Sequence, residues 1–322
     1  MKIQYLICVP LVFLLPLLHS GCSDEIDPDP FGITVDTDGD GVADISDRCP
    51  ETPAGADTDD FGCPVGSEYT YVPDDAFEQI LINNELDDTL DDYVLTESIR
   101  ALTELYLNSS ENLNITDFTG IEGFESLGSL YINLMSLSGV TLDLSQNSPL
   151  RQLSFACDDI ADLTIISPNI ETLSILGISD LCPMWRNVSG LDLTGLPNLK
   201  NLHLSGVTFS DLNATLNTAT SIETLWTENI TGENGPLELL DLSPNNNLKL
   251  VTIWATNAEG PDKINLKNGA NQLLGALRLG VNPAFEWQVC VEVDDPDYIE
   301  SIISSAFGVP LPDYTVTQDC SN

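Results

Sequence analysis

A recurring leucine pattern constrains the fold of this chain more than any other feature. The spacing L-x-x-L-x-L, with other residues at some positions, recurs within residues 102–282. Its eight copies, which start 20 to 29 residues apart, are Leu102/Leu105/Leu107, Leu127/Leu130/Ile132, Leu150/Leu153/Phe155, Ile170/Leu173/Ile175, Leu199/Leu202/Leu204, Ile222/Leu225/Thr227, Leu248/Val251/Ile253 and Leu274/Leu277/Leu279. Alternating apolar residues predict short strands with one buried face, which a single copy cannot cover alone. We therefore expect the copies to stack around one continuous core.

A second pattern precedes several of these copies. It reads Leu-Asp-Leu at residues 142–144, 191–193 and 240–242, and no long helical periodicity lies between the predicted strands. The pattern predicts a second short strand in each turn, which makes the fold mainly β. The repeats resemble those of leucine-rich-repeat proteins over residues 102–282, and the resemblance implies a solenoid with a cap at each end.

Residues 67–101 resemble the N-terminal cap of bacterial leucine-rich-repeat surface proteins. Within them, Asp75 and Glu78 have the spacing of a capping box, and Phe77, Ile80 and Leu81 fit one face of a helix. At the other end we expect residues 283–322 to form the C-terminal cap, with a short helix over 297–306.

The N-terminus has the features of an export signal. Lys2 precedes an apolar run that ends at Leu18, which is too short to span a membrane comfortably and predicts a signal peptide over residues 1–21. The signal ends in His19-Ser20-Gly21-Cys22, which resembles a bacterial lipobox except that His19 stands where Leu is usual. The resemblance implies lipidation of Cys22 and an outer-membrane lipoprotein exposed on the cell surface. Ordinary cleavage nearby, which would release a free secreted protein, is the alternative.

The acidic segment 22–35 predicts a disordered tether. It also resembles the acidic tag with which some Gram-negative bacteria send lipoproteins to the outer face of the outer membrane, although a plain solvated spacer would look the same.

Residues 36–66 contain a regular spacing of aspartates. Counted from Asp36, oxygen-bearing side chains occupy positions one, three, five, nine and twelve, which are Asp36, Asp38, Asp40, Asp44 and Asp47. Gly41 stands at position six and Val42 offers a carbonyl at position seven, as in an EF-hand-type calcium loop. The flanking residues are not helical. The spacing therefore predicts a Ca²⁺ site outside a true EF-hand.

The aspartate loop continues through Cys49-Pro50 and closes with Phe61-Gly62-Cys63-Pro64. Residues 36–64 together resemble a thrombospondin type 3 repeat. The resemblance implies a Cys49–Cys63 disulfide and Ca²⁺ held mainly by aspartates, with Asp57 and Asp59 added to the ligand set. An acidic disordered stretch is the alternative. The inferred role is structural, a calcium-stiffened stalk between anchor and solenoid.

The chain has eight cysteines, of which Cys8 lies in the signal and Cys22 is assigned to lipid. An even number of cysteines in an exported chain indicates disulfides, and the remaining six are Cys49, Cys63, Cys157, Cys182, Cys290 and Cys320. We expect Cys290 and Cys320 to be bridged across the C-terminal cap. Cys157 and Cys182 are then left, but their different offsets in consecutive repeats leave their pairing open.

The chain is strongly acidic, with 10 basic and 51 acidic residues and a net charge of -41. This charge repels nucleic acid and anionic lipid and favours divalent cations or basic partners. After removal of the signal His203 is the only histidine, and no catalytic motif is present. We therefore expect no nucleic-acid partner, no enzymatic activity and membrane attachment through the lipid alone.

The residues between the leucines should point outward onto the exposed sheet face. The middle positions of the eight copies are Tyr106, Tyr131, Ser154, Ser174, His203, Trp226, Thr252 and Arg278. The positions two residues further on are Asn108, Asn133, Ala156, Leu176, Ser205, Glu228, Trp254 and Gly280. Concave solenoid faces commonly carry partners, and Trp and Tyr are frequent anchors of binding energy. The candidate binding residues are Tyr106, Tyr131, His203, Trp226, Trp254 and Arg278.

Three functions fit this sequence. The first is protein recognition or adhesion through the sheet face. The second is glycan binding with Trp226 and Trp254 as stacking platforms, and the third is a structural surface component without a ligand. Burial of the aromatic residues by loops, or an error in the strand register, would remove the candidate face.

Overall fold

The computed structural model describes residues 35–47, 49–50, 52, 57–58, 62–63, 69–108, 114–133, 135–177, 187–256 and 260–321. The chain divides into two compact units, Met1–Val65 and Gly66–Asn322. The predicted signal and lipidation site, Cys22 included, lie outside the described residues. Within the described residues, no helix combines the length and the apolar character needed to cross a bilayer.

The described part of the first unit consists mainly of turns and bends. A disulfide joins Cys49 to Cys63, the pair that the resemblance implied. Next to it, the buried hydroxyl of Thr52 donates to the carbonyl oxygens of Gly62 and Cys49 at 2.7 and 3.0 Å. The disulfide and these hydrogen bonds therefore tie Cys49 and Thr52 to Gly62 and Cys63.

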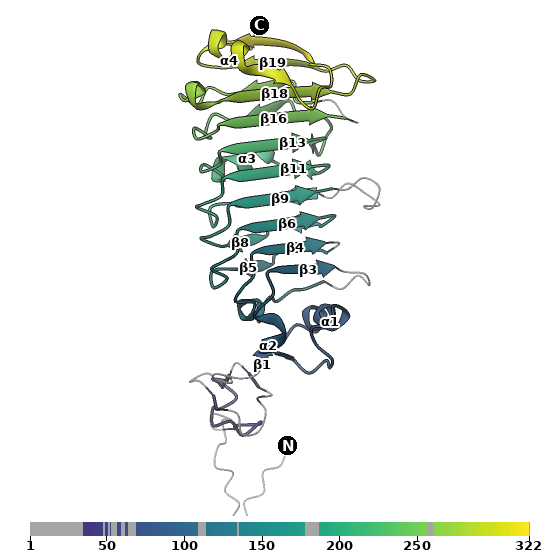
Figure 1. Cartoon of the computed structure of the whole chain (residues 1–322), viewed down its shortest axis with the longest axis vertical. Coiled ribbons are helices and arrows are strands. Elements are labelled where there is room, and N and C mark those ends of the chain that lie inside the picture. Colours follow the sequence, from purple (N-terminus) through teal and green to yellow (C-terminus); the bar gives the residue numbers. More distant parts are fainter. Residues whose placement is uncertain are drawn as a thin grey trace, which may run out of the picture. The chain divides into compact units, whose positions relative to one another are not determined.

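The second unit is a β-solenoid built on one long parallel sheet (Figure 1). Each of the eight predicted copies supplies one strand, so the predicted repeats are confirmed. The eight strands are β3 (Glu104–Asn108), β4 (Ser129–Asn133), β6 (Gln152–Ala156), β9 (Thr172–Leu176), β11 (Asn201–Ser205), β13 (Thr224–Glu228), β16 (Leu250–Ala255) and β18 (Ala276–Val281). A ninth strand, β20 (Ile303–Ser305), pairs with β18 and extends the sheet beyond the repeats.

Shorter parallel sheets form the other sides of the solenoid. One contains β7 (Ile160–Ala161), β10 (Asn187–Ser189), β12 (Thr208–Phe209) and β14 (Thr231–Gly232). Two others contain β5 (Thr141–Asp143) with β8 (Thr164–Ile166), and β15 (Leu239–Asp241) with β17 (Lys263–Asn265), β19 (Gln288–Glu292) and β21 (Asp313–Thr317). The Leu-Asp-Leu pattern thus predicts β5 and β15 correctly. At residues 191–193 it gives only a bridge from Asp192 to Thr164.

Few helices interrupt this pattern in the described residues. They are α1 (Asp75–Asn83), α2 (Thr96–Ile99), η1 (Ile121–Gly123), α3 (Leu212–Thr218), η2 (Asn271–Leu273) and α4 (Pro296–Ile302).

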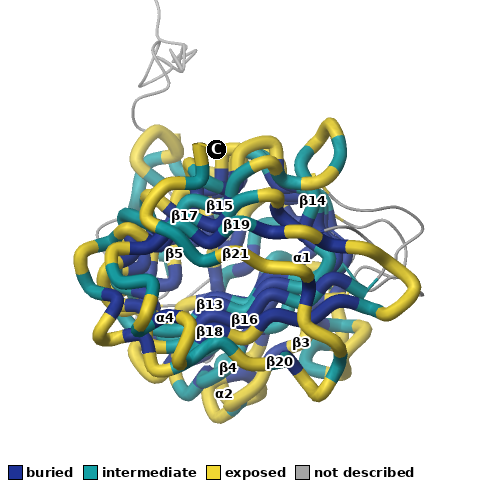
Figure 2. Tube along the Cα trace, turned by 90° about the horizontal axis from the view of Figure 1, so that it is seen from above, coloured by how far each residue is buried: buried dark blue, intermediate teal, exposed yellow. Residues whose placement is uncertain are grey.

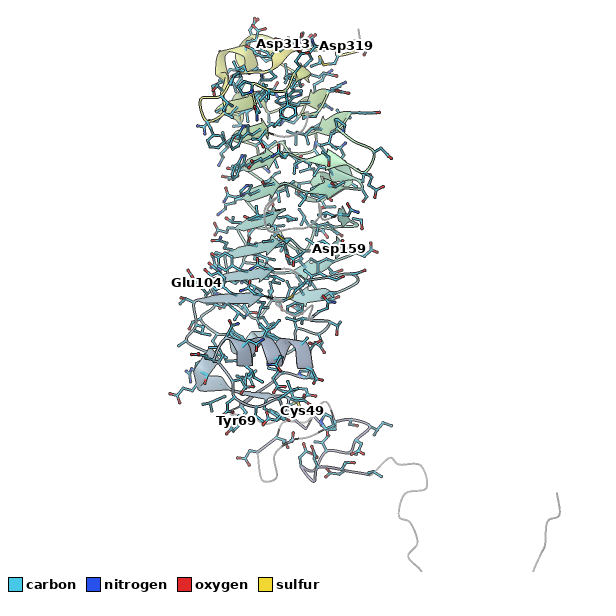
Figure 3. The ribbon with its side chains drawn as sticks, turned by 90° about the vertical axis from the view of Figure 1, so that its right-hand side faces the viewer. Cys49, Tyr69, Glu104, Asp159, Asp313 and Asp319 are labelled. Carbon is cyan, nitrogen blue, oxygen red and sulfur yellow. A yellow bond between two sulfur atoms is a disulfide. The ribbon has the colours of Figure 1, made fainter. Side chains whose placement is uncertain are left out.

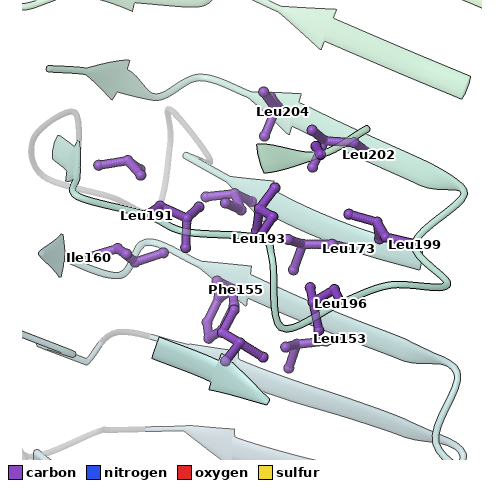
Figure 4. Close-up of a cluster of buried hydrophobic side chains, with 14 of the residues drawn as sticks. Leu153, Phe155, Ile160, Leu173, Leu191, Leu193, Leu196, Leu199, Leu202 and Leu204 are labelled. Carbon is purple, nitrogen blue, oxygen red and sulfur yellow. The ribbon is translucent and has the colours of Figure 1, made fainter. Parts of the chain in front are cut away.

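The core runs along the solenoid between the long sheet and the shorter strands (Figure 2). Leucines of successive copies lie above one another, as Figure 4 shows for Leu153, Leu173 and Leu202, and each is at most 1% exposed. The residues two positions later form a second buried row, and Leu191 and Leu193 fill the opposite side (Figure 4). Because every turn covers its neighbours, the core has no break between repeats.

The N-terminal cap contains an antiparallel pair of strands and a helix. Strand β1 (Tyr69–Tyr71) pairs antiparallel with β2 (Tyr93–Leu95), and α1 lies between them in the sequence. Phe77, Ile80 and Leu81 are buried, which confirms the predicted helical face. The predicted capping box is wrong.

The helix α1 is capped by Asp74, whose carboxylate accepts from the backbone N–H groups of Ala76 and Phe77, each at 3.0 Å. The Glu78 carboxylate does not cap the start of the helix, because it accepts the backbone N–H groups of Asp91 and Tyr93 instead.

The C-terminal cap contains one more turn of the solenoid. The predicted helix over 297–306 is too long, since α4 ends at Ile302 and the next three residues join the long sheet as β20. The sheet hydrogen bonds of β20 replace those of a further helical turn. Cys290 and Cys320 form the predicted disulfide, which joins β19 to the segment after β21.

Candidate binding face

The strand register places the predicted outward residues in two straight rows across the long sheet. The middle row contains Tyr106, Tyr131, Ser154, Ser174, His203, Trp226, Thr252 and Arg278. The second row contains Asn108, Asn133, Ala156, Leu176, Ser205, Glu228, Trp254 and Gly280. Both rows match the sequence prediction, so the six candidate residues lie on one face.

Two tyrosines form a patch at the N-terminal end of this face. The rings of Tyr106 and Tyr131 stack with their centroids 4.5 Å apart and their planes 6° from parallel. Tyr106 is 45% exposed, and its hydroxyl donates to Glu104 at 3.2 Å. Figure 3 marks Glu104 on β3, the first strand of the sheet. The loss of water and the hydrogen bond to Glu104 raise the pKa of Tyr106, so its phenol is neutral near pH 7.

A second aromatic patch lies nearer the C-terminal end. The rings of His203 and Trp226 stack at 3.5 Å on adjacent strands. Burial lowers the pKa of His203 to about 4, so the imidazole is neutral near pH 7. His203 Nε2 and the indole N–H groups of Trp226 and Trp254 are buried and lack hydrogen-bond partners in the described part of the chain.

The sequence prediction missed Phe307, which completes this patch. It follows β20 in a turn, and its ring lies 5.0 Å from that of Trp254 and 6.0 Å from that of Trp226. Phe307 is 65% exposed and has a φ of 51°, which is unusual for a residue with a bulky side chain. It lies outside the leucine pattern, so no sequence signal placed it on the sheet.

Small residues separate the two patches, and here the predicted exposure is wrong. Ser154 and Ser174, which lie between the patches, are buried although they occupy the outward row, and Thr252, which lies beyond Trp226, is buried as well. Their side chains are short, and aromatic or cationic side chains flank the row on either side, so little of their surface reaches water. Three strand spacings lie between Tyr131 and His203, a separation of about 14 Å. Arg278 is exposed, as predicted.

The face differs in composition from the rest of the chain. Three outward positions in each of the eight repeat strands give 24 positions, of which Glu104 and Glu228 carry carboxylates and Arg278 a cation. Carboxylates thus occupy one position in twelve, against 51 of 322 residues in the whole chain. Four of the 24 are Tyr or Trp, whereas all aromatic residues make up 7% of the chain. The face is therefore poorer in carboxylates and richer in aromatic groups than the chain as a whole.

The aspartate loop of the first unit is a separate candidate site. Asp36, Asp38 and Asp40 each offer a carboxylate oxygen within 4.8 Å of the other two. Asp40 Oδ2 is buried and has no hydrogen-bond partner among the described residues. Asp47 lies close by, because a Cβ atom on Gly62 would come within 3 Å of both Asp47 and Asp40. Clustered carboxylates with an unused oxygen suit Ca²⁺.

The other predicted calcium ligands have different surroundings. Both carboxylate oxygens of Asp44 accept from Thr37, each at 2.7 Å. Val42 donates its N–H to Asp40, and Asp57 is exposed. Asp59 lies outside the described residues. Desolvation, together with the charges of Asp38 and Asp40, raises the pKa of Asp47.

One predicted pair of cysteines is described only in part by the structure. Cys157 is disulfide-bonded. Its expected partner, Cys182, lies outside the described residues, so this pairing stays a prediction.

No protein-family model and no curated protein matches the chain. Among solved structures, the chain is similar to internalin C2 of Listeria monocytogenes, with 17% identity and a TM-score of 0.39 over 78% of this chain and 98% of that one. It is also similar to the internalin InlF of the same species, with 15% identity and a TM-score of 0.38 over 76% of this chain and 77% of that one. Similarities at this level carry no argument about function, which rests on the geometry of the chain itself.

Proposed function

We propose that this protein is a non-enzymatic recognition module that binds a partner protein through the long sheet, in recognition or adhesion at a bacterial surface. The observation that carries the proposal is the charge-poor aromatic face in a chain with a net charge of -41. The centres of protein interfaces are depleted in charge and enriched in Tyr and Trp, which supply much of the binding energy. The two patches would act as anchors at the two ends of one contact.

The structure favours a protein over a glycan as the ligand. Sugar stacking needs an open ring face, but Phe307 packs against both Trp226 and Trp254. The tyrosine patch also presents its rings stacked on one another. Two patches about 14 Å apart suit a ligand that spans several strands, as a folded partner or an extended peptide does.

Binding assays on single-patch variants test this proposal. The exported chain is used to capture partners from extracts of neighbouring or host cells and, in parallel, is applied to a glycan array. Trp226→Ala and Tyr106→Ala should each weaken capture at least tenfold, because truncating a residue that anchors an interface typically costs about 2 kcal/mol or more. Ile166→Ala is the matched control, since Ile166 is 39% exposed on β8, away from the long sheet. Capture that both patch variants retain would contradict the proposal, and a hit on the glycan array alone would replace it with glycan binding.

We further propose that the protein is attached to the outer membrane through a lipid on Cys22. The sequence that supports this proposal is the lipobox-like segment before Cys22. Metabolic labelling with a fatty-acid analogue should mark the wild-type chain and leave Cys22→Ser unmarked. Equal labelling of both chains, or none of the wild type, would contradict the anchor.

We also propose that the aspartate loop binds Ca²⁺ and stiffens the stalk. The support is the Asp36, Asp38 and Asp40 cluster with the buried, unpartnered Asp40 Oδ2. These three residues and Asp47 would hold the ion, and the Cys49–Cys63 disulfide lies directly after them in the sequence. Calorimetric titration of the full chain should lose one class of Ca²⁺ sites in Asp38→Asn/Asp40→Asn. An unchanged titration would rule this loop out as a binding site.

A further inference from the structure

The N-terminal cap has a concentration of negative charge that the binding face does not explain. Residues 69–99 contain nine Asp and Glu side chains and no Lys, Arg or His. Surface carboxylates can remain apart in water, so their number alone indicates nothing. One of them, however, lies in the interior of the cap.

That carboxylate belongs to Glu78, in the helix α1, and its side chain is 0% exposed. Its Oε1 atom accepts the backbone N–H groups of Asp91 at 2.8 Å and Tyr93 at 3.2 Å. Its Oε2 atom is buried and has no hydrogen-bond partner among the described residues. An unpartnered charged oxygen in the interior is strongly unfavourable, so it requires either a proton or a cation.

The neighbours of Glu78 add negative charge instead of compensating it. Asp75, Glu78 and Asp92 each offer a carboxylate oxygen within 4.8 Å of the other two. Asp87 is also close, and its own Oδ2 atom is buried without a partner in the described chain. Desolvation raises the pKa of Glu78, and the charges of Asp87 and Asp92 raise it further.

We propose that Asp75, Glu78 and Asp92 bind a divalent cation, Ca²⁺, in the N-terminal cap. Carboxylate oxygens are its preferred ligands, and Ca²⁺ accepts irregular sets of six to eight oxygens more readily than Mg²⁺ does. The ion would use the unpartnered oxygen of Glu78 and remove the repulsion among the three groups. It would also fasten the turn before β2 to α1, since Asp92 directly precedes that strand.

This site is distinct from the aspartate loop of the first unit and does not depend on the function proposed for the sheet. The two calcium sites can be separated by tyrosine-sensitised terbium luminescence. Tb³⁺ replaces Ca²⁺ and emits when an excited tyrosine is close. The backbone of Tyr93 donates to Glu78, and its ring lies 5.3 Å from that of Tyr71. Residues 23–68 contain neither Tyr nor Trp, so the aspartate loop has no sensitiser of its own.

The experiment uses the full chain, titrated with Tb³⁺ and then with competing Ca²⁺. The wild type and the stalk variant Asp38→Asn/Asp40→Asn should show the same sensitised emission, and Ca²⁺ should displace it. Glu78→Gln should lose at least nine-tenths of the emission. Its amide keeps an acceptor for Asp91 and Tyr93 and replaces Oε2 with a neutral donor, so the cap should still fold.

Thermal unfolding of the same chains separates a metal site from a structural carboxyl group. In the stalk variant, Ca²⁺ at about 100 times its dissociation constant should raise the unfolding midpoint by about 5 °C over the value in EDTA. Adding Glu78→Gln to that variant should abolish the rise without lowering the midpoint in EDTA. The absence of any Ca²⁺ response in the stalk variant would overturn the proposal and leave Glu78 protonated. An equal response with Glu78→Gln would place the ion elsewhere.

Discussion

Individual asparagines join neighbouring turns of this solenoid through its core. Asn245 is 0% exposed, and its side-chain amide donates to the carbonyl oxygens of Leu216 at 3.0 Å and Ala219 at 2.9 Å, where α3 ends. Asn147 does the same four repeats earlier, and its amide donates to Ile121 at the start of η1 and to Phe124 directly after η1. Both amides therefore give buried carbonyl groups of a preceding turn a second hydrogen bond, in addition to the backbone N–H that each of them accepts.

We predict that Asn245→Ala lowers the free energy of unfolding by about 2 kcal/mol, because it removes two buried hydrogen bonds, to Leu216 and Ala219, of about 1 kcal/mol each. Asn245→Asp should cost more, since a carboxylate of nearly the same shape cannot donate and brings a buried charge. Asn247→Ala is the control, as Asn247 is exposed and donates only to Thr220. Its effect in urea unfolding should stay below about 0.5 kcal/mol. Equal costs for Asn245→Ala and Asn247→Ala would contradict the role of the buried amide.

The sequence alone could not show that Asn245 is buried and Asn247 exposed, because both stand in the polar turn after the Leu-Asp-Leu segment 240–242. For the same reason it assigned Glu78 to a helix cap. A polar side chain that points inward and hydrogen-bonds the backbone of another element follows no repeating sequence pattern. By contrast, the outward residues such as Tyr106 and Trp226 followed directly from the strand period, since every second residue points the same way.

At the scale of the elements, the repeat strands could be predicted and the ends of the solenoid could not. The leucine spacing repeats eight times, so an error in one copy is corrected by the others. The last strand of the long sheet, β20, and the turn with Phe307 occur once and lack the pattern. Their conformation is set by pairing with Leu277–Leu279 of β18, a contact between elements 26 residues apart.

The C-terminal elements depend on the Cys290–Cys320 disulfide, which closes a segment of 30 residues. We predict that Cys290→Ser/Cys320→Ser destabilises the end of the solenoid by about 3.5 kcal/mol through the added freedom of the unfolded segment. Because each turn contacts only its neighbours, the loss should be local. Hydrogen exchange should accelerate in β19 and β21 and remain unchanged in β3 and β4. Uniform acceleration along the whole solenoid would show that the end is coupled to every repeat.

Charge acts on the molecule as a whole. The chain has 51 acidic and 10 basic residues, and five ion pairs are present in its described part. Most of these pairs are exposed, where each contributes at most about 1 kcal/mol. Repulsion among the excess carboxylates therefore outweighs attraction, and it acts over about 30 Å at 0.01 M salt but about 10 Å at 0.1 M.

We predict that raising NaCl from 0.01 to 0.3 M in EDTA stabilises the fold, because screening weakens the repulsion more than it weakens the ion pairs. A gain on the order of 1 kcal/mol would raise the unfolding midpoint by about 3 °C. Potassium acetate at equal ionic strength should give the same rise, since screening does not depend on the identity of the ion. A midpoint that falls with salt would mean that the ion pairs, such as Lys200–Glu171, dominate the electrostatic energy of the solenoid. We expect partner binding by the aromatic face, in contrast, to change little with salt. In the repeat strands described, Glu104, Glu228 and Arg278 are the only charged residues that point outward.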